Sequence, residues 1–420
     1  MGWNSWDCYG ASVAEDEVRG NADYLTANLK RFGWEYVVVD IQWYEPGANS
    51  SLYRKYVPLA MDKWSRLIPA ENRFPSSGRG RGFRPLAEHV HGLGLKFGIH
   101  IMRGIPRQAA HANSPVLGTP AGARRIAHPN SICPWNTDMY GVDPAEPGAQ
   151  EYYNSLFALY AEWEVDYVKV DDIAASKIYG THVGELELIR RAIDSCGRPM
   201  VLSLSPGPAP VERADDFIRN ANLWRVTDDF WDRWELLLDM FDRCEKWYSS
   251  CGPGHWPDCD MLPLGHIGIR SVDGGGADRM SRFTRDEQLT LMTLWSIFRS
   301  PLMFGGELRD MDEWTYSLLT NREVLAVHAD FANCRPVLRE GTRIVWTSRG
   351  PGDDVAVALF NVGDAPQAIS AEWNALGLSG PRLVRNLWTR ADEGEADGEL
   401  RRVLPPHGST LLRLRKRAGP

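Results

Sequence analysis

Short β-rich apolar runs alternate with helical patterns along most of this 420-residue chain. Eight such runs can be recognised as far as residue 304, and each is followed by a helical pattern or a long loop. Strands that alternate with helices favour a parallel sheet, and eight repeats are typical of a (β/α)8 barrel. The expected strands are residues 1–6, 36–40, 96–100, 166–171, 200–205, 222–227, 256–261 and 300–304.

The pattern changes after residue 330. Runs such as TRIVWTS and DVAVALFNV alternate polar and apolar residues between Gly, Pro and Asp turns, as in an antiparallel β-sandwich. We therefore expect a catalytic barrel over residues 1–330 and a C-terminal β-sandwich domain over residues 331–420. The second domain contains no convergent set of polar residues, so we assign it to support or to assembly into a homo-oligomer.

The composition is that of a globular protein with a formal net charge of −8. No basic cluster is longer than the terminal RLRKR, so a nucleic-acid partner is not expected. No apolar run approaches the roughly 20 residues that cross a bilayer, so we expect no membrane segment. Seven scattered cysteines favour free thiols in a reducing compartment, and hence a cytoplasmic location. The spacing of Cys244, Cys251 and Cys259 matches no usual zinc pattern, and we expect neither a metal nor another cofactor.

The run YVKVDD, residues 167–172, carries charged side chains where a buried strand needs only apolar ones. Side chains alternate faces along a strand, so Lys169 and Asp171 share one face and the valines beside them share the other. In a barrel the valine face packs on the helices, which places Lys169 and Asp171 in the mouth, where barrel enzymes keep their active sites. A charged pair there is costly to bury unless it is paired or used. The alternative is a structural Lys–Asp bridge that caps the barrel.

The same alternation in LWRVTDDF, residues 223–230, places Arg225 and Asp229 on one face. Asp229 is the second candidate carboxylate, and Arg225 would hold it or the substrate. Asp40 and Asp260 lie at the ends of two further expected strands. A single aspartate at a strand end is more often the N-cap of the next helix. Four strand ends that deliver carboxylates to one rim favour a functional site.

Carboxylates gathered with tryptophans, and without metal-ligand spacing, are typical of glycoside hydrolysis. In that reaction one carboxylate attacks or stabilises the anomeric centre and the other supplies the proton. The partner is then a carbohydrate substrate. The alternative from another class is a carbohydrate-binding barrel without catalysis, and the presence of both Asp171 and Asp229 argues against it.

Several motifs occur in the order and spacing of one enzyme family, among them MGWNSW, DYVKVDD, LWRVTDDFWDRW, GPGHWPDCDML and RSPLMFGGEL. By these motifs the chain resembles glycoside hydrolase family 27, the family of α-galactosidases and α-N-acetylgalactosaminidases. The resemblance spans the whole barrel and reaches LPPHGSTLLRL near the C-terminus, which is similar to the end of that family's β-sandwich.

The resemblance implies a retaining mechanism and a role for each matched residue. Asp171 matches the nucleophile of the family's K-x-D motif, and Asp229 matches the acid/base four residues after the motif's arginine. The positions that match sugar contacts are Trp6, Asp40, Lys169, Arg225, Asp260 and Met261.

Three departures from the family pattern bear on the substrate. Ile41 stands where the family usually has a second aspartate after Asp40, so one group that would bind the axial 4-hydroxyl and C6 region of galactose is missing. His100 replaces the usual tyrosine at the end of the third strand. Ser205 and its small neighbours end the fifth strand, near the sugar's 2-substituent, and could leave room for a larger group.

Our first interpretation is an exo-glycosidase acting on terminal α-D-galactosides. β-L-arabinopyranosides are the main alternative, because that sugar is galactose without C6. α-N-acetylgalactosaminides and isomaltose-type α-glucosides are further alternatives on the same scaffold.

Residues 100–143 have no counterpart that we can place in the family. The segment follows the third strand, so we expect it to lie over the barrel mouth as a lid or a subsite. Its candidate sugar contacts are His100, Arg103, Trp135 and Asp138, with loop packing as the alternative for each.

Overall fold

A computed structural model describes residues 1–272 and 276–417 of the chain. The chain divides into two compact units that are interleaved in sequence. The first unit comprises residues 1–230, 260–280 and 303–311, and the second comprises residues 231–259, 281–302 and 312–420. The expected boundary between residues 330 and 331 stays a prediction, because this division follows packing rather than a single cut.

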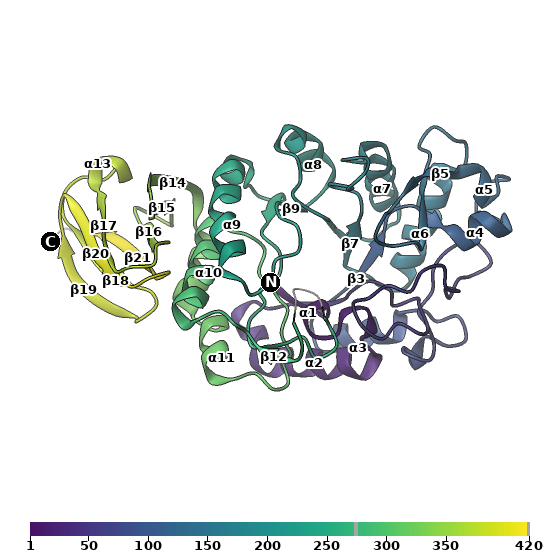
Figure 1. Cartoon of the computed structure of the whole chain (residues 1–420), viewed down its shortest axis with the longest axis horizontal. Helices are drawn as coiled ribbons and strands as arrows, with labels where there is room; N and C mark the ends of the chain where they lie inside the picture. The colour runs from purple at the N-terminus through teal and green to yellow at the C-terminus, as the bar shows by residue number, and fades with distance from the viewer. Residues whose placement is uncertain (273–275, 418–420) are drawn as a thin grey trace. The chain divides into compact units, whose positions relative to one another are not determined.

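The eight expected strands form one curled sheet in the order β10-β9-β8-β7-β3-β2-β1-β13 (Figure 1). The strand pairs from β13 through β1, β2, β3 and β7 to β9 are parallel. A parallel bridge between Leu262 and Phe304 brings the chain after β10 beside β13. The fold is therefore the predicted barrel. Its strands are β1 (Gly2–Asn4), β2 (Tyr36–Val39), β3 (Lys96–Met102), β7 (Tyr167–Asp171), β8 (Val201–Leu204), β9 (Leu223–Arg225), β10 (Trp256–Asp258) and β13 (Met303–Phe304).

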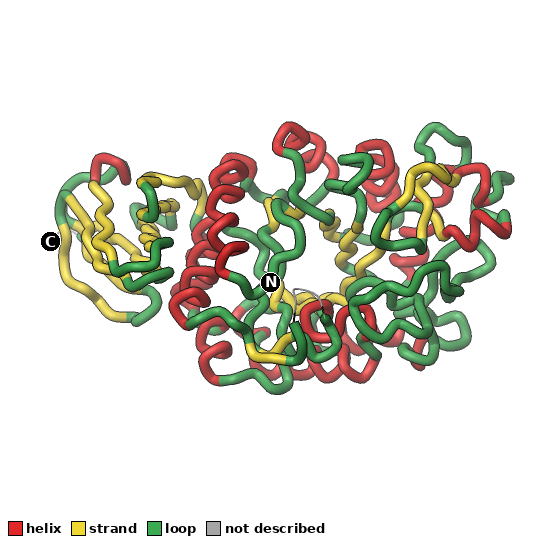
Figure 2. Tube along the Cα trace, viewed as in Figure 1, coloured by secondary structure: helices red, strands yellow, loops and turns green. Residues whose placement is uncertain are grey.

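Helices of the first unit lie outside the curled sheet (Figure 2). They are amphipathic, and their apolar residues, such as Val18 and Leu25 of α2, are buried. Local signals set their ends, as where Glu17 accepts a hydrogen bond from the backbone N–H of Ala14 at 2.9 Å. These helices are α2 (Glu15–Asn28), α3 (Arg84–Gly92), α6 (Ala149–Glu162), α7 (Val183–Ser195) and α8 (Ala214–Asn220).

The segment after β3 folds as a small substructure of its own. Its strands form a three-stranded sheet in the order β4-β6-β5, in which β6 is antiparallel to both neighbours. Its role as a lid stays a prediction. Its elements are β4 (Ile105–Pro106), α4 (Arg107–Ala112), α5 (Ala123–Ile126), β5 (Ala127–Ile132) and β6 (Met139–Val142).

The C-terminal part of the second unit is the predicted antiparallel sandwich. One sheet has the strand order β14-β15-β16-β21-β18-β19, and the other pairs β17 with β20. Ile369 and Leu400 from the small sheet join Val357 and Leu412 of the large sheet in one apolar core. The strands are β14 (Ala332–Glu340), β15 (Arg343–Arg349), β16 (Val355–Asn361), β17 (Gln367–Glu372), β18 (Arg382–Asn386), β19 (Ala391–Ala396), β20 (Glu399–Leu404) and β21 (Ser409–Lys416).

The second unit also contains α9 (Trp234–Trp247) and α10 (Arg285–Phe298). Thr284 and Glu287 form a reciprocal capping box at the start of α10. All seven cysteines are free thiols, and two of them, Cys244 and Cys259, lie with their sulfur atoms 3.6 Å apart. Within residues 1–272 and 276–417, no helix is long and apolar enough to cross a membrane.

Candidate active site

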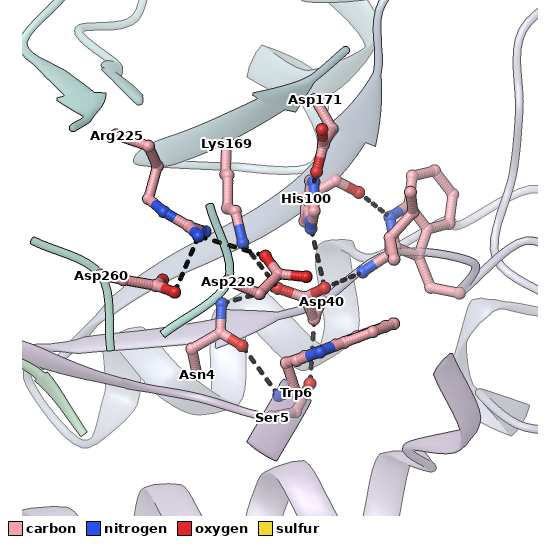
Figure 3. Close-up of polar contacts among 12 residues, drawn as sticks. Asn4, Ser5, Trp6, Asp40, His100, Lys169, Asp171, Arg225, Asp229 and Asp260 are labelled. Carbon is pink, nitrogen blue, oxygen red and sulfur yellow. Dashed lines mark hydrogen bonds and ion pairs between the residues drawn. The ribbon is translucent and has the colours of Figure 1, made fainter. Parts of the chain in front are cut away.

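The end of β7 places Lys169 and Asp171 among polar partners, as the strand alternation predicts. Val168 and Val170 are completely buried on the other face. One carboxylate oxygen of Asp171 lies 3.1 Å from Nε2 of His100, at the end of the neighbouring strand β3. Its other oxygen accepts a hydrogen bond from the backbone N–H of Asp172 at 2.6 Å. Both oxygens of Asp171 are therefore held in place, and Figure 3 shows the contact with His100.

Asp40 follows β2 and is the centre of the polar network. His100 Nδ1 lies 2.8 Å from one of its oxygens. The side-chain amide of Asn4 donates to the other oxygen at 2.9 Å, and Lys169 Nζ lies 3.5 Å from that same atom. The backbone N–H of Asp40 donates to Ser5 Oγ at 3.0 Å. Three strands thus deliver side chains to one carboxylate.

The charges of the network offset the cost of burying it. Burial alone would raise the pKa of Asp40, but His100 and Lys169 outweigh it and hold that pKa well below its usual range. Burial likewise opposes ionisation of Asp171, yet the hydrogen bond from His100 and the charges of His100 and Lys169 lower its pKa. Burial would lower the pKa of Lys169, but Asp40 raises it above its ordinary value. At neutral pH the pattern is an ionised Asp40, an ionised Asp171 and a protonated Lys169.

Arg225, on β9, holds the second group of carboxylates. One guanidinium nitrogen lies 3.1 Å from Asp229 and 2.8 Å from Asp260. Asp260 also accepts the backbone N–H of Phe230 at 2.8 Å, which ties the strand ends together. The side chain of Asp229 is 59% exposed, whereas that of Asp260 is 5% exposed. Asp229 is therefore the carboxylate of this pair that a ligand can reach.

The two groups lie in one site (Figure 3). The charges of Asp171, Arg225 and Asp260 all act on Lys169. The arrangement joins a buried, ionised carboxylate to an exposed carboxylate across a basic pair. Such a pair of carboxylates can act as a nucleophile and as an acid/base group. Among residues 1–272 and 276–417, no group of three His, Cys, Asp or Glu side chains is placed to hold a metal.

Comparison with known proteins identifies the family. Residues 137–330 match the family model of alpha galactosidase A, and residues 340–414 match that of the alpha galactosidase C-terminal beta sandwich domain. A family 27 β-L-arabinopyranosidase from Geobacillus stearothermophilus is 65% identical, with a TM-score of 0.99 over 100% of this chain and 97% of that one. The chain belongs to glycoside hydrolase family 27.

Two further relatives of this family 27 glycosidase differ in their names. A Bacillus halodurans protein, provisionally named an α-N-acetylgalactosaminidase, is 57% identical, with a TM-score of 0.91 over 99% of this chain and 96% of that one. Alpha-galactosidase 2 of Arabidopsis thaliana is 27% identical over 99% of this chain and 89% of its own length. A variant of the Geobacillus enzyme was solved in complex with arabinose. These matches establish the family.

The structure brings most of the predicted site residues of this glycosidase together. Trp6 lies beside the network, with its backbone N–H donating to Asn4 at 2.8 Å. Ser205 directly follows β8, next to β7, and its backbone N–H donates to the carbonyl of Val170 at 2.9 Å. Its buried hydroxyl has no hydrogen-bond partner among the described residues. Met261 directly follows Asp260 in the sequence and is buried. The roles of these residues stay predictions.

For two residues of the 100–143 segment the structure favours loop packing over sugar contact. Arg103 is 2% exposed and binds Asp172 and Glu185. Asp138 is also buried and accepts hydrogen bonds from Gln42 at 2.8 Å and Tyr44 at 3.0 Å. Both charged groups therefore already have partners inside the protein.

Trp135 lies at the end of an aromatic row. Its ring centroid is 5.4 Å from that of Tyr53, which in turn is 6.1 Å from that of Trp6. His100, the fourth candidate of the segment, lies inside the network between Asp40 and Asp171. Trp135 therefore stays a candidate sugar contact, whereas His100 is buried and both of its ring nitrogens face carboxylates of the network.

Sequence reasoning missed Asn4 and Ser5, which hold Asp40 from the end of β1. Both lie in the MGWNSW motif, so their position beside an expected strand end was the available signal. Their side chains are 2% and 0% exposed. Buried polar side chains at a strand end bind a neighbouring polar group, because an unpaired one is costly.

Proposed function

We propose that this glycosidase is a retaining exo-β-L-arabinopyranosidase. The observation that carries the proposal is Ile41, an apolar residue that is 1% exposed and directly follows Asp40 in the site. The family pattern puts a second aspartate there, for the C4 and C6 side of galactose. A sugar without C6 leaves nothing for that carboxylate to bind. The 65% identity to a β-L-arabinopyranosidase supports the same substrate.

In the proposed reaction, a carboxylate oxygen of Asp171 attacks the anomeric carbon while the glycosidic C–O bond breaks. Asp229 gives its proton to the departing oxygen, and a glycosyl ester on Asp171 results. Water then attacks the same carbon, its proton passes to Asp229, and the ester bond to Asp171 breaks. The free sugar keeps the anomeric configuration of the substrate.

The network suits these two roles. Contacts with His100 and Lys169 keep Asp171 ionised, as a nucleophile must be. The exposed side of Asp229 is open to a leaving group, and Arg225 steers its carboxylate. Asn4, Lys169 and His100 hold Asp40 in a fixed orientation in which it can accept hydrogen bonds from sugar hydroxyls.

The apolar side chain of Ile41 determines how strongly the enzyme should prefer the arabinoside over the galactoside. A galactoside would bring its C6 hydroxyl against an apolar side chain, and a buried hydroxyl without a partner costs about 1 to 3 kcal/mol. At about 1.4 kcal/mol per tenfold in rate, the preference for the arabinoside is roughly 5- to 150-fold in kcat/KM.

The test is a panel of p-nitrophenyl glycosides with the β-L-arabinopyranoside, α-D-galactoside, α-N-acetylgalactosaminide and α-D-glucoside. We expect the arabinoside to have the highest kcat/KM. Ile41→Asp should narrow or reverse its lead over the galactoside, whereas Ile41→Val should keep it. A galactoside that reacts faster in the wild type would contradict the proposal, and cleavage of none of the four would favour a binding protein.

One observation favours a second candidate, an α-N-acetylgalactosaminidase. The buried hydroxyl of Ser205 has no partner among the described residues and lies where the family meets the sugar's 2-substituent. The provisional name of the 57% identical relative agrees with it. The same panel separates the two candidates, because only this one predicts fast cleavage of the N-acetylated substrate.

A further inference from the structure

We propose that Arg103 is a positioning residue that fixes the nucleophilic carboxylate of Asp171 by holding the next residue, Asp172, in place. The inference rests on the proposed role of Asp171. The sequence makes Arg103 only a candidate sugar contact, which its burial argues against, and the comparisons with known proteins give it no role.

Arg103 follows β3 and reaches both residues of the Asp171–Asp172 step. Its backbone N–H donates to the carbonyl of Asp171 at 3.0 Å, which extends the β3–β7 ladder by one bond. Its Nε donates to the carbonyl of Asp172 at 2.6 Å, and a terminal guanidinium nitrogen lies 2.9 Å from the carboxylate of Asp172. One side chain therefore holds both the main chain and the side chain of Asp172.

The conformation of Asp172 explains why it needs to be held. Its φ is +57°, in the left-handed region that non-glycine residues rarely adopt. Its N–H donates to the carboxylate of Asp171 at 2.6 Å. If Asp172 reached an ordinary φ by a turn of the peptide group that joins it to Asp171, the N–H would turn with that group and Asp171 would lose one of its two anchors.

The far side of the guanidinium is fixed as well. Glu185, at the start of α7, lies 2.8 Å from another of its nitrogens, and the hydroxyl of Tyr153 donates to Glu185 at 2.6 Å. Gly141 of β6 lies so close that a Cβ there would be 2.5 Å from the Arg103 nitrogen NH1. Asp172, Glu185 and Gly141 together therefore restrict the movement of the Arg103 guanidinium.

The contacts distinguish Arg103, which positions the nucleophile, from Glu185, which stabilises the fold. Asp172 is joined to Asp171 by the N–H contact, whereas the contacts of Glu185 are with Arg103 and Tyr153. A change at Arg103 should therefore displace the nucleophile, and a change at Glu185 should mainly reduce stability. A displacement of about 1 Å in a reacting group can cost on the order of a hundredfold in rate.

The readout is the rate at which the nucleophile is labelled by a cyclitol aziridine of arabino configuration. In that step the carboxylate oxygen of Asp171 bonds to the ring carbon, the C–N bond breaks and the nitrogen takes a proton. Peptide mass spectrometry of the labelled wild type first shows which residue carries the label. A label on any residue other than Asp171 would overturn both the proposed function and the role of Arg103.

With Asp171 labelled, we expect Arg103→Lys to slow labelling about a hundredfold, because lysine cannot make the two-sided contact with Asp172. Gly141→Ala should also slow it, by at least tenfold, since the added methyl group would meet both the guanidinium and the side chain of Ser131 and would displace the guanidinium without removing a charge. This second variant decides the question if Arg103→Lys does not fold.

Glu185→Gln is the matched control. It should lower the melting temperature and label within threefold of the wild-type rate. The role of Arg103 is overturned, and the proposed function is not, if Arg103→Lys labels within threefold of wild type. It is also overturned if Glu185→Gln is slowed as much as Arg103→Lys, since the network would then act only through folding.

Discussion

The raised pKa of Asp172 predicts that the folded protein loses stability as the pH rises from acidic to neutral values. Burial raises its pKa to about 6, Arg103 partly opposes that effect, and the charge of Asp171 adds to it. The ordinary value, which the unfolded chain should show, is 3.8. The folded protein therefore binds this proton more tightly than the unfolded chain. The stabilisation from the protonated form is complete below pH 3.8 and is lost as the pH rises toward 6.

The magnitude follows from the difference between the two pKa values. A gap of about 2.2 units, at about 1.4 kcal/mol per unit, corresponds to about 3 kcal/mol. Asp172→Asn has no proton to exchange in this range. Relative to wild type, the variant should therefore gain about 2.4 kcal/mol of unfolding free energy between pH 4 and pH 7, because at pH 4 this carboxyl is already partly ionised in the unfolded chain.

The assay is urea unfolding of both proteins at pH 4, 5, 6 and 7, with the free energy difference plotted against pH. The difference removes the titration of groups that the two proteins share. A flat difference would show that Asp172 titrates at its ordinary pKa. A variant that loses stability relative to wild type as the pH rises would show that the Arg103 pair dominates burial, contrary to our reasoning.

Three further substitutions test the site. Asp171→Asn should fold normally and have less than about a thousandth of wild-type kcat, because the amide is a poor nucleophile; steady-state kinetics and circular dichroism check this, and higher activity would contradict it. Asp229→Asn should slow glycosides with poor leaving groups far more than p-nitrophenyl glycosides, since only the former need full protonation; equal losses across a leaving-group series would count against it. His100→Phe removes the contact that lowers the pKa of Asp171, so the acidic limb of the kcat/KM profile should move to higher pH; an unchanged limb would assign that ionisation to another group.

Strand alternation was enough to predict the central part of the site. The period of two along a strand is fixed by backbone geometry, so Lys169 and Asp171 had to share a face once the run was recognised as a strand. Arg225 and Asp229 also lie 3.1 Å apart, but β9 ends at Arg225, so the loop after the strand makes this contact and strand alternation does not explain it. The fold was readable because eight repeats of strand and helix leave few topologies.

The support behind Asp171 could not be predicted from the sequence. The left-handed φ of Asp172 and the approach of Gly141 to Arg103 depend on how two loops meet in space. No period connects residues 103, 141, 172 and 185. A charged residue in a loop is usually solvated, and nothing in the sequence indicates that Arg103 and Asp138 are buried, as they are in the structure.

The charge of the site gives a second reason for an apolar residue at position 41, and this reason can be tested. Asp40, Asp171, Asp229 and Asp260 form ion pairs in the site with three basic side chains, those of His100, Lys169 and Arg225. An aspartate at position 41 would add a further carboxylate, and a sugar without C6 would offer it no hydroxyl. Ile41→Asp should therefore destabilise the free enzyme more than Ile41→Asn does, by about 1 to 3 kcal/mol, because only the first adds a buried charge. The comparison is made by thermal unfolding at pH 7, and galactoside hydrolysis should improve in both variants because both can bind the C6 hydroxyl. Equal melting temperatures would mean that the basic side chains can neutralise a further buried carboxylate. The apolar residue at position 41 would then be explained by the shape of the sugar alone.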